Sequence, residues 1–382
     1  MISRRLLSTI PAAALAVCFA LLLGPPVLGR DVVKLIPTFN LTGYYDDNIQ
    51  FSPGDPVADY YALISPGLGL RLNLPVIPIE VDYSYIRYQY RKQSSYNRDY
   101  HYLSIRALYG YDFQVMRNLT VSIEDNYELV PVDVTIPDDQ PDNLTQRNTF
   151  SVSPVWEGRL SRKLKLAAGY EFSRVDYTSS RFRGNDYFGH RFFNRLDYEI
   201  DRSLTCFQRN TYRIKDFSSA PYYTEFLPEA GVEMGLGPRA SLSAAGGYSF
   251  EETGGERNNG YVYTITGKWS ATARLDLEAK LQRRRTVDIE AEPYTERFYE
   301  LVLRYQPAKK LVLESYARYY DDTIRSADYR RIGLKAGAVY HLNRWSSLNC
   351  GYLRYQSLDT PAEEKVVSNR VYAGISISFG DW

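Results

Sequence analysis

A strict alternation of apolar and polar residues runs through most of this chain, and few folds can accommodate it. In residues 118–129 one face carries Leu119, Val121, Ile123, Tyr127 and Leu129, and the other carries Thr120, Ser122, Glu124, Asn126 and Glu128. Successive side chains of a β-strand point to opposite sides, whereas a helical stripe needs a period of 3.6. The polar face is too polar for a dry protein core. The pattern therefore indicates strands with one face in lipid and the other in water.

Eighteen segments show this alternation and are predicted to be strands. They are residues 34–46, 59–72, 77–91, 99–113, 118–129, 147–160, 164–177, 186–200, 204–217, 222–236, 240–251, 260–270, 275–282, 295–306, 311–321, 327–342, 346–357 and 366–379. The pattern is least regular in 204–217, so sixteen strands is the alternative. An open sheet edge in hydrocarbon would leave backbone groups without hydrogen bonds. We therefore predict an all-β fold: a single closed antiparallel transmembrane β-barrel.

The connections alternate between short turns, such as 161–163 and 237–239, and longer loops, such as 47–58 and 131–146. In bacterial barrels the short turns are periplasmic and the longer loops face outside. An even number of strands then places both termini in the periplasm, and the predicted location is the cell outer membrane.

Residues 1–29 are predicted to be a signal peptide, with Arg4 and Arg5 ahead of an apolar run from Ala12 to Leu23. Residues 30–382 are predicted to form the barrel. No later stretch approaches the roughly 18 consecutive apolar residues of a membrane helix.

Composition supports a membrane location and argues against several other functions. The chain has 35 tyrosines, whose rings and hydroxyls suit a membrane boundary, and a formal net charge of +1, so nucleic acid is not an expected partner. The three histidines fall on separate predicted strands with no catalytic serine or carboxylate spacing nearby. We expect no enzymatic activity, no cofactor and no metal site.

The last predicted strand carries an apolar stripe, and the chain ends in Trp382. The stripe consists of Val371, Ala373, Ile375, Ile377 and Phe379. An aromatic-terminated final strand resembles the signal by which outer-membrane proteins are recognised for insertion. The expected partners are therefore the barrel-assembly machinery, through this strand, and the lipid and lipopolysaccharide of the outer membrane.

Two segments near the amino terminus, Tyr44-Tyr45-Asp46-Asp47-Asn48-Ile49 and Ile64-Ser65-Pro66-Gly67-Leu68, carry a family resemblance. They are similar to the opening of the β-barrel porins called beta-barrel porin 2. The resemblance implies an outer-membrane barrel, and it implies a possible partnership with an exopolysaccharide or exosortase apparatus.

The third long loop is acidic, and the inward faces of the wall carry arginines. The loop residues are Asp133, Asp138, Asp139 and Asp142, and the inward arginines are Arg71, Arg106, Arg159, Arg191 and Arg195. One hypothesis folds the loop into the lumen, where opposed charges would sort ions in a constriction. The alternative is an acidic loop on the outer surface.

Aromatic residues also fall on the inward face, namely Tyr102, Phe193, Tyr316, Tyr320 and Tyr372. They could stack on sugar rings along a path, or they could fill lumen space or form the rim girdles. Eighteen strands about 4.8 Å apart and tilted near 40° give a backbone diameter of about 35 Å, which side chains cannot fill. The first functional hypothesis is a porin-like channel for passive passage of small hydrophilic solutes or saccharides. The alternative is a non-conducting or gated barrel component of an exopolysaccharide export system.

Overall fold

The computed structural model describes residues 32–74, 77–111, 118–133, 136, 143–287, 292–324, 327–359 and 365–379. The predicted signal peptide and Trp382 lie outside these residues.

The described chain forms one sheet that closes on itself. Its strands are β1 (Val33–Asp46), β2 (Asp59–Leu72), β3 (Ile79–Tyr90), β4 (Arg98–Tyr111), β5 (Leu119–Pro131), β6 (Leu144–Arg159), β7 (Leu164–Tyr177), β8 (Tyr187–Glu199), β9 (Leu204–Phe217) and β10 (Tyr223–Gly235). The second half contains β11 (Ala240–Thr253), β12 (Glu256–Arg257), β13 (Gly260–Thr272), β14 (Leu275–Val287), β15 (Pro293–Ala308), β16 (Leu311–Ile324), β17 (Ala327–His341), β18 (Ser346–Asp359) and β19 (Val367–Ser378). Two short 3₁₀ turns, η1 (Ser94–Tyr96) and η3 (Arg183–Asn185), lie in connections.

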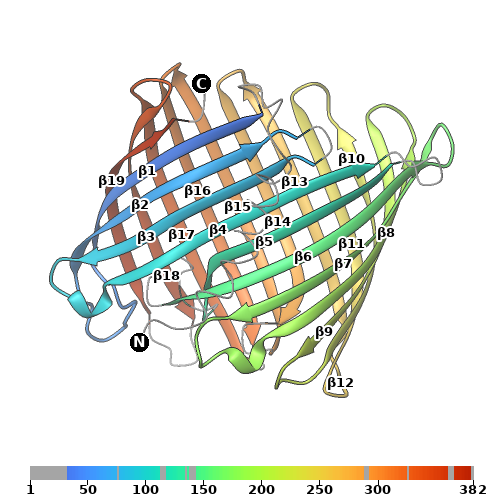
Figure 1. Cartoon of the computed structure of the whole chain (residues 1–382), viewed down its shortest axis with the longest axis horizontal. Coiled ribbons are helices and arrows are strands. Elements are labelled where there is room, and N and C mark those ends of the chain that lie inside the picture. The colour runs from blue at the N-terminus through green and yellow to red at the C-terminus, as the bar shows by residue number, and fades with distance from the viewer. Residues whose placement is uncertain are drawn as a thin grey trace.

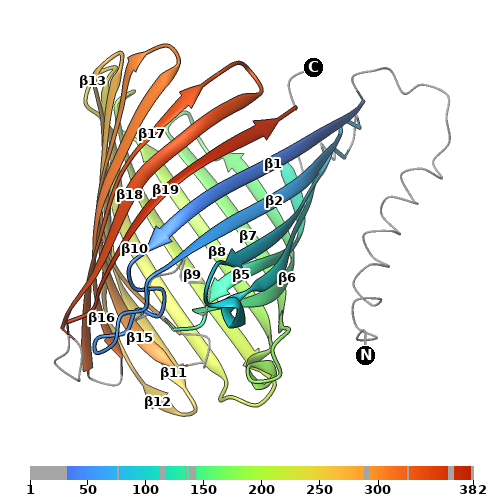
Figure 2. The same cartoon turned by 90° about the vertical axis from the view of Figure 1, so that its left-hand side faces the viewer.

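Each long strand pairs antiparallel with its neighbours in sequence, and β1 pairs with β19 to close the ring. β12 pairs only with the end of β11, whereas β11 pairs directly with β13, so β12 is an extension of one hairpin. Among the described residues the wall therefore has eighteen strands, which confirms the predicted closed all-β barrel and makes the sixteen-strand alternative unnecessary. Figures 1 and 2 show the strands inclined steeply around the lumen, and Figure 2 shows β1 and β19 side by side.

The two faces of the wall differ as predicted. Along β1 the apolar residues Leu35, Phe39 and Leu41 are exposed on the outer side. Their neighbours Asn40 and Thr42 point inward and are less exposed. Oily side chains that stay exposed in a folded protein need a non-aqueous surrounding, so the outer surface fits a bilayer.

One stretch of the outer surface is polar, and it lies where the sequence pattern is weakest. On β8 and β9 the amides of Asn194, Gln208 and Asn210 face outward near mid-strand, and they bond to one another. Gln208 Nε2 donates to Asn210 Oδ1 at 2.8 Å, and Asn210 Nδ2 donates to Asn194 Oδ1 at 3.1 Å. These residues blur the alternation in 204–217. The strand β9 nevertheless spans the same residues, because its backbone pairs in register with both β8 and β10.

The short turns lie at the end of the barrel where β1 begins and β19 ends (Figure 2). In the β10–β11 turn Gly237 has a φ of +85°, a left-handed conformation that favours glycine. Among the residues that the structure describes, no helix has the length and apolar character needed to cross a membrane.

Candidate functional site

The inner wall is lined with ion pairs that join neighbouring strands. Arg–Glu pairs include Arg106–Glu124 at 3.0 Å, Arg147–Glu128 at 2.7 Å, Arg191–Glu171 at 2.7 Å, Arg209–Glu229 at 2.7 Å and Arg318–Glu300 at 2.5 Å. Cross-strand pairs of opposite charge stabilise a sheet and leave little local net charge. The lumen surface is therefore polar, with acid and base balanced around the ring.

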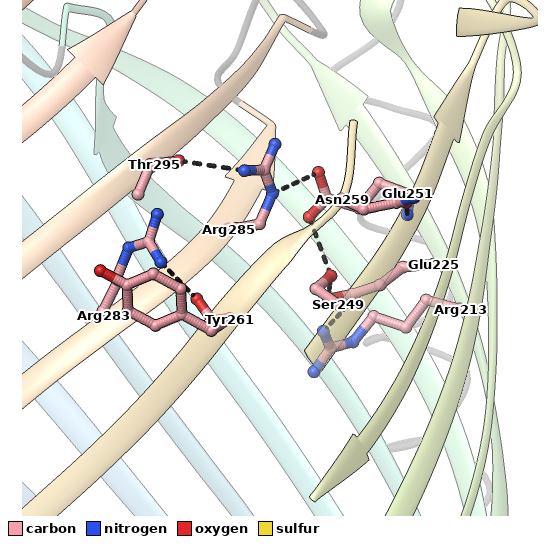
Figure 3. Close-up of polar contacts among 9 residues, drawn as sticks. All are labelled: Arg213, Glu225, Ser249, Glu251, Asn259, Tyr261, Arg283, Arg285 and Thr295. Atoms are coloured by element: carbon pink, nitrogen blue, oxygen red, sulfur yellow. Dashed lines mark hydrogen bonds and ion pairs between the residues drawn. The ribbon is translucent and has the colours of Figure 1, made fainter. Parts of the chain in front are cut away.

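A buried chain of polar groups closes the loop end of the wall between β9 and β15 (Figure 3). Arg213 pairs with Glu225, and the Ser249 hydroxyl lies 2.9 Å from Glu225 Oε1 and 3.1 Å from Glu251 Oε1. Arg285 reaches over the start of β13, where Gly260 has no side chain, and bonds Glu251 through Nε at 3.0 Å. A larger residue at position 260 would meet the Arg285 guanidinium at 2.9 Å. The Arg285–Glu251 contact joins β14 to β11, two strands that do not pair directly, and so adds to the register pairing of β9, β10 and β11.

The seam between β1 and β19 is held by residues of the amino-terminal motif. Arg370 Nε lies 2.6 Å from Asp46 Oδ2, and both side chains are almost completely buried, at 1% and 2% exposed. Ser368 Oγ donates to Asp46 Oδ1 at 2.9 Å, and Asn369 donates through its backbone N–H to Asp47 Oδ1 at 2.7 Å. Asn48 Nδ2 donates to the Val367 carbonyl at 3.0 Å. The motif therefore fastens the closing strand.

A tyrosine-lined cavity of about 580 Å³ opens on the lumen between β1, β16, β17, β18 and β19. Its rings are Tyr44, Tyr316, Tyr320, Tyr355 and Tyr372, and its cations are Arg318, Arg331 and Lys335. Arg318 lies over the Tyr316 ring at 4.2 Å and Arg331 over Tyr320 at 4.4 Å. Such stacking holds the rings and guanidinium groups in fixed orientations. The cavity can offer flat ring faces and N–H donors to a polar solute.

Three of the five predicted lumen aromatics, Tyr316, Tyr320 and Tyr372, meet in this cavity. The other two lie elsewhere on the wall. Phe193 lies under the Arg191 guanidinium at 5.2 Å and fills the space above Gly169, where a Cβ would come within 2.4 Å of its ring. Tyr102 points inward from β4, opposite Ser84 of β3.

The five wall arginines singled out in the sequence point inward, but four of them pair with carboxylates of the wall. Arg71 bonds both carboxylate oxygens of Asp82 at 2.9 Å, and Arg195 pairs with Asp197 at 2.7 Å and Glu233 at 2.8 Å. Arg106 and Arg191 hold the glutamates named above. Arg159 is exposed at the last position of β6. Arg71 and Arg159 stand at the short-turn end of their strands, away from the acidic loop.

One described residue of the third long connection, Ile136, contacts a distant strand of the wall, which the sequence did not indicate. The Asn143 side chain joins the two ends of this connection: its Oδ1 accepts from the Asp133 N–H at 2.7 Å, and its Nδ2 donates to the Asp133 carbonyl at 2.8 Å. Arg331 Nη1 of β17 then donates to the Ile136 carbonyl at 2.8 Å, although β17 lies far round the ring from β5 and β6. Asp138, Asp139 and Asp142 lie outside the described residues. Inward parity was the only sequence signal at Arg331.

Groups suited to catalysis or metal binding do not gather in the described part of the chain. No group of three or more His, Cys, Asp or Glu residues there could hold a metal ion. His101 and His190 face outward and bond the hydroxyls of Tyr83 and Tyr170 at 2.9 and 2.7 Å. Both histidines are thus positioned in the wall by tyrosines.

A closed barrel with an oily outer surface and a charged, cavity-bearing lumen defines a porin-like protein of the outer membrane. The chain belongs to the Putative beta-barrel porin 2 family, whose model matches residues 33–379. The match to this family confirms the resemblance seen at the amino terminus and extends it over nearly the whole barrel.

Solved porin structures share this fold at low sequence identity. Pseudomonas aeruginosa OpdO is 12% identical, with a TM-score of 0.51 over 91% of this chain and 98% of that one. P. aeruginosa OpdQ is 11% identical, with a TM-score of 0.52 over 92% and 98%. Acinetobacter baumannii OccAB3 is 11% identical, with a TM-score of 0.51 over 91% and 99%. No curated protein matches the sequence. At these identities the likeness concerns the fold alone.

Proposed function

We propose that the protein is a passive outer-membrane channel for small hydrophilic solutes, with saccharides as the favoured class. The observation that carries this proposal is the tyrosine-lined cavity of about 580 Å³ on a lumen wall of paired charges. Paired charges provide hydrogen bonds to hydroxyl groups without a strong preference for either sign of ion. Half-buried tyrosine rings that line a cavity beside guanidinium donors suit the apolar and polar sides of a sugar.

The proposed orientation places the longer loops outside the cell and both termini in the periplasm. Two features support it: β1 begins and β19 ends at the short-turn end, and bacterial barrels keep short turns in the periplasm. The apolar outer stripe of β19 is the proposed contact with the barrel-assembly machinery, and lipopolysaccharide is the proposed neighbour of the loop end.

We further propose that the third loop narrows the path, with Asp133, Asp138, Asp139 and Asp142 as its acidic groups. The bond from Arg331 to the Ile136 carbonyl supports an inward course of this loop. Arg71, Arg106, Arg191 and Arg195 pair with wall carboxylates. Arg331 also pairs with one, Asp322 at 3.5 Å, but it donates to the loop as well, so it is the proposed wall cation of the constriction.

Liposome swelling with neutral sugars of graded size tests the proposed function. Liposomes containing the folded protein should swell quickly in a pentose, more slowly in a disaccharide and least in a large oligosaccharide. Tyr316→Ala with Tyr372→Ala should change the ratio of sugar rates more than the rate for a small neutral amide. Folded protein that gives no swelling in the pentose would reject the passive channel and favour a gated component of an exopolysaccharide system.

A further inference from the structure

A row of charged residues crosses the outer face of the barrel near its loop end. The strand register places Arg283 of β14 opposite Arg297 of β15, Arg297 opposite Asp321 of β16, and Asp321 opposite Arg330 of β17. These positions share the outward parity of Leu281, Leu301 and Leu334, which are 38%, 51% and 41% exposed. Three arginines and one aspartate thus lie on the membrane side of four consecutive strands.

The neighbouring row of outward residues, one step closer to the middle of the barrel wall, indicates how deep the charged row lies in the membrane. It carries Leu281, Tyr299, Tyr319 and Ile332, and Tyr299 and Tyr319 pack with ring centroids 5.7 Å apart. Tyrosines on the outer surface of barrels gather at the membrane interface, and an arginine placed deeper in hydrocarbon is strongly destabilising. The arginine row therefore lies at headgroup level, with acyl chains beginning below it.

The three arginines of this row outnumber the described carboxylates that pair with them. Asp321 pairs with both Arg297, at 3.2 Å, and Arg330, at 3.7 Å, and Arg330 also pairs with Asp328 at 3.8 Å. Arg283 is stacked on Tyr261 with its Cζ 3.6 Å from the ring centroid, and Nη1 donates to the Tyr261 carbonyl at 2.8 Å (Figure 3). Within the described residues Arg283 forms no ion pair with a carboxylate, and its buried Nε has no hydrogen-bond partner.

Like charges directly opposite on neighbouring strands repel each other unless an anion lies between them. Arg283 and Arg297 are such a pair, and both guanidinium groups are planar forks suited to phosphate oxygens. We infer that Arg283 and Arg297, with Arg330 beside them, bind the phosphate group of a membrane lipid. The ring of Tyr261 and the Tyr299–Tyr319 pair lie where its sugar and acyl portions would continue.

The assignment of this lipid to lipid A, the phosphorylated anchor of lipopolysaccharide, rests on the proposed orientation with the longer loops outside. Only that leaflet presents diphosphorylated glucosamine to the loop end. A periplasmic position for the same row would instead present glycerophospholipids, and a site for a soluble anion would take inorganic phosphate.

Native mass spectrometry of the purified full chain tests the site. The wild-type protein should retain lipid A in preference to phosphatidylglycerol and to lipid A stripped of its phosphates. The double variant Arg283→Gln with Arg297→Gln should have an affinity for lipid A that is lower by about tenfold or more, which is the loss expected for two charge-assisted contacts. Arg87→Gln is the matched control, because Arg87 also faces outward near the loop end but pairs with Asp99 at 3.2 Å.

Each arm has an outcome that overturns the inference. Equal retention by the double variant or equal retention of dephosphorylated lipid A removes the phosphate site. Preference for phosphatidylglycerol, or displacement by an equal concentration of inorganic phosphate, removes the assignment to lipid A. A heat-shifted band on a detergent gel shows that the variant is folded. The sugar flux through the double variant should equal that of the wild type. Lipid binding and sugar flux are therefore separate measurements, and the lipid site can fail while the proposed channel stands.

Discussion

Asp46 and Arg370 lie at the seam where β1 and β19 close the ring. Both side chains are buried, and they form an ion pair with each other. Removing one member of a buried pair leaves an uncompensated charge, which destabilises a protein by about 3–5 kcal/mol.

Arg370→Met should therefore lower the free energy of unfolding by about 3–5 kcal/mol, measured by urea titration of the protein in lipid vesicles. Arg106→Met is the control: the Arg106 side chain is 58% exposed beside Glu124, and such pairs contribute at most about 1 kcal/mol. Similar losses for the two variants would contradict a special role of the seam pair.

At the residue scale, sequence predicts which way a side chain points more readily than what it touches. Inward parity places Tyr316, Tyr320 and Tyr372 on the lumen side, and the structure brings all three to one cavity. The bonds of Arg370 to Asp46 and of Arg331 to Ile136 join segments more than a hundred residues apart. No local pattern encodes them, because they depend on ring closure and on the course of a loop.

Strand β9 carries a feature that belongs to the element, a hydrogen-bonded row of amides on its lipid face. Asn210 lies near mid-strand and shares its amide with Asn194 and Gln208. Amide groups in hydrocarbon keep donors unsatisfied, while a leucine would gain contact with acyl chains.

Asn210→Leu should raise the free energy of unfolding in vesicles by about 1 kcal/mol. Asn40→Leu, on the inward face of β1, should bring no gain because that side chain already faces the aqueous lumen. A loss of stability in Asn210→Leu would mean that the amide row is needed in place, for instance against another protein surface.

The third loop is the element on which the proposed constriction depends. Asp138→Asn with Asp139→Asn removes two negative charges and should shift the reversal potential under a salt gradient toward anions. Asp55→Asn, an exposed residue of the first loop, should leave it unchanged. An unaltered reversal potential in the double variant would place the loop outside the ion path.

The strands themselves follow from the sequence to within a few residues, because period-2 alternation survives wherever one face meets lipid. Even the least regular segment, 204–217, coincides with β9. The short β12 was not anticipated, since Glu256–Arg257 is a polar hairpin extension with no buried face to leave a pattern.

For the whole molecule, closure and polarity together make a channel the simplest function. The β1–β19 pairing removes the last free edge, and the ring of ion pairs keeps the interior wettable. Solved structures share this fold at 10 to 12% identity, so the fold does not depend on most of the particular residues.

Single-channel recording in planar lipid bilayers tests the central claim, that this two-faced barrel encloses a water-filled path. Purified, heat-shiftable protein should give discrete, long-lived openings with a nearly linear current–voltage relation and weak ion selectivity. Folded protein that inserts into the bilayer yet leaves it silent at all voltages would contradict the account.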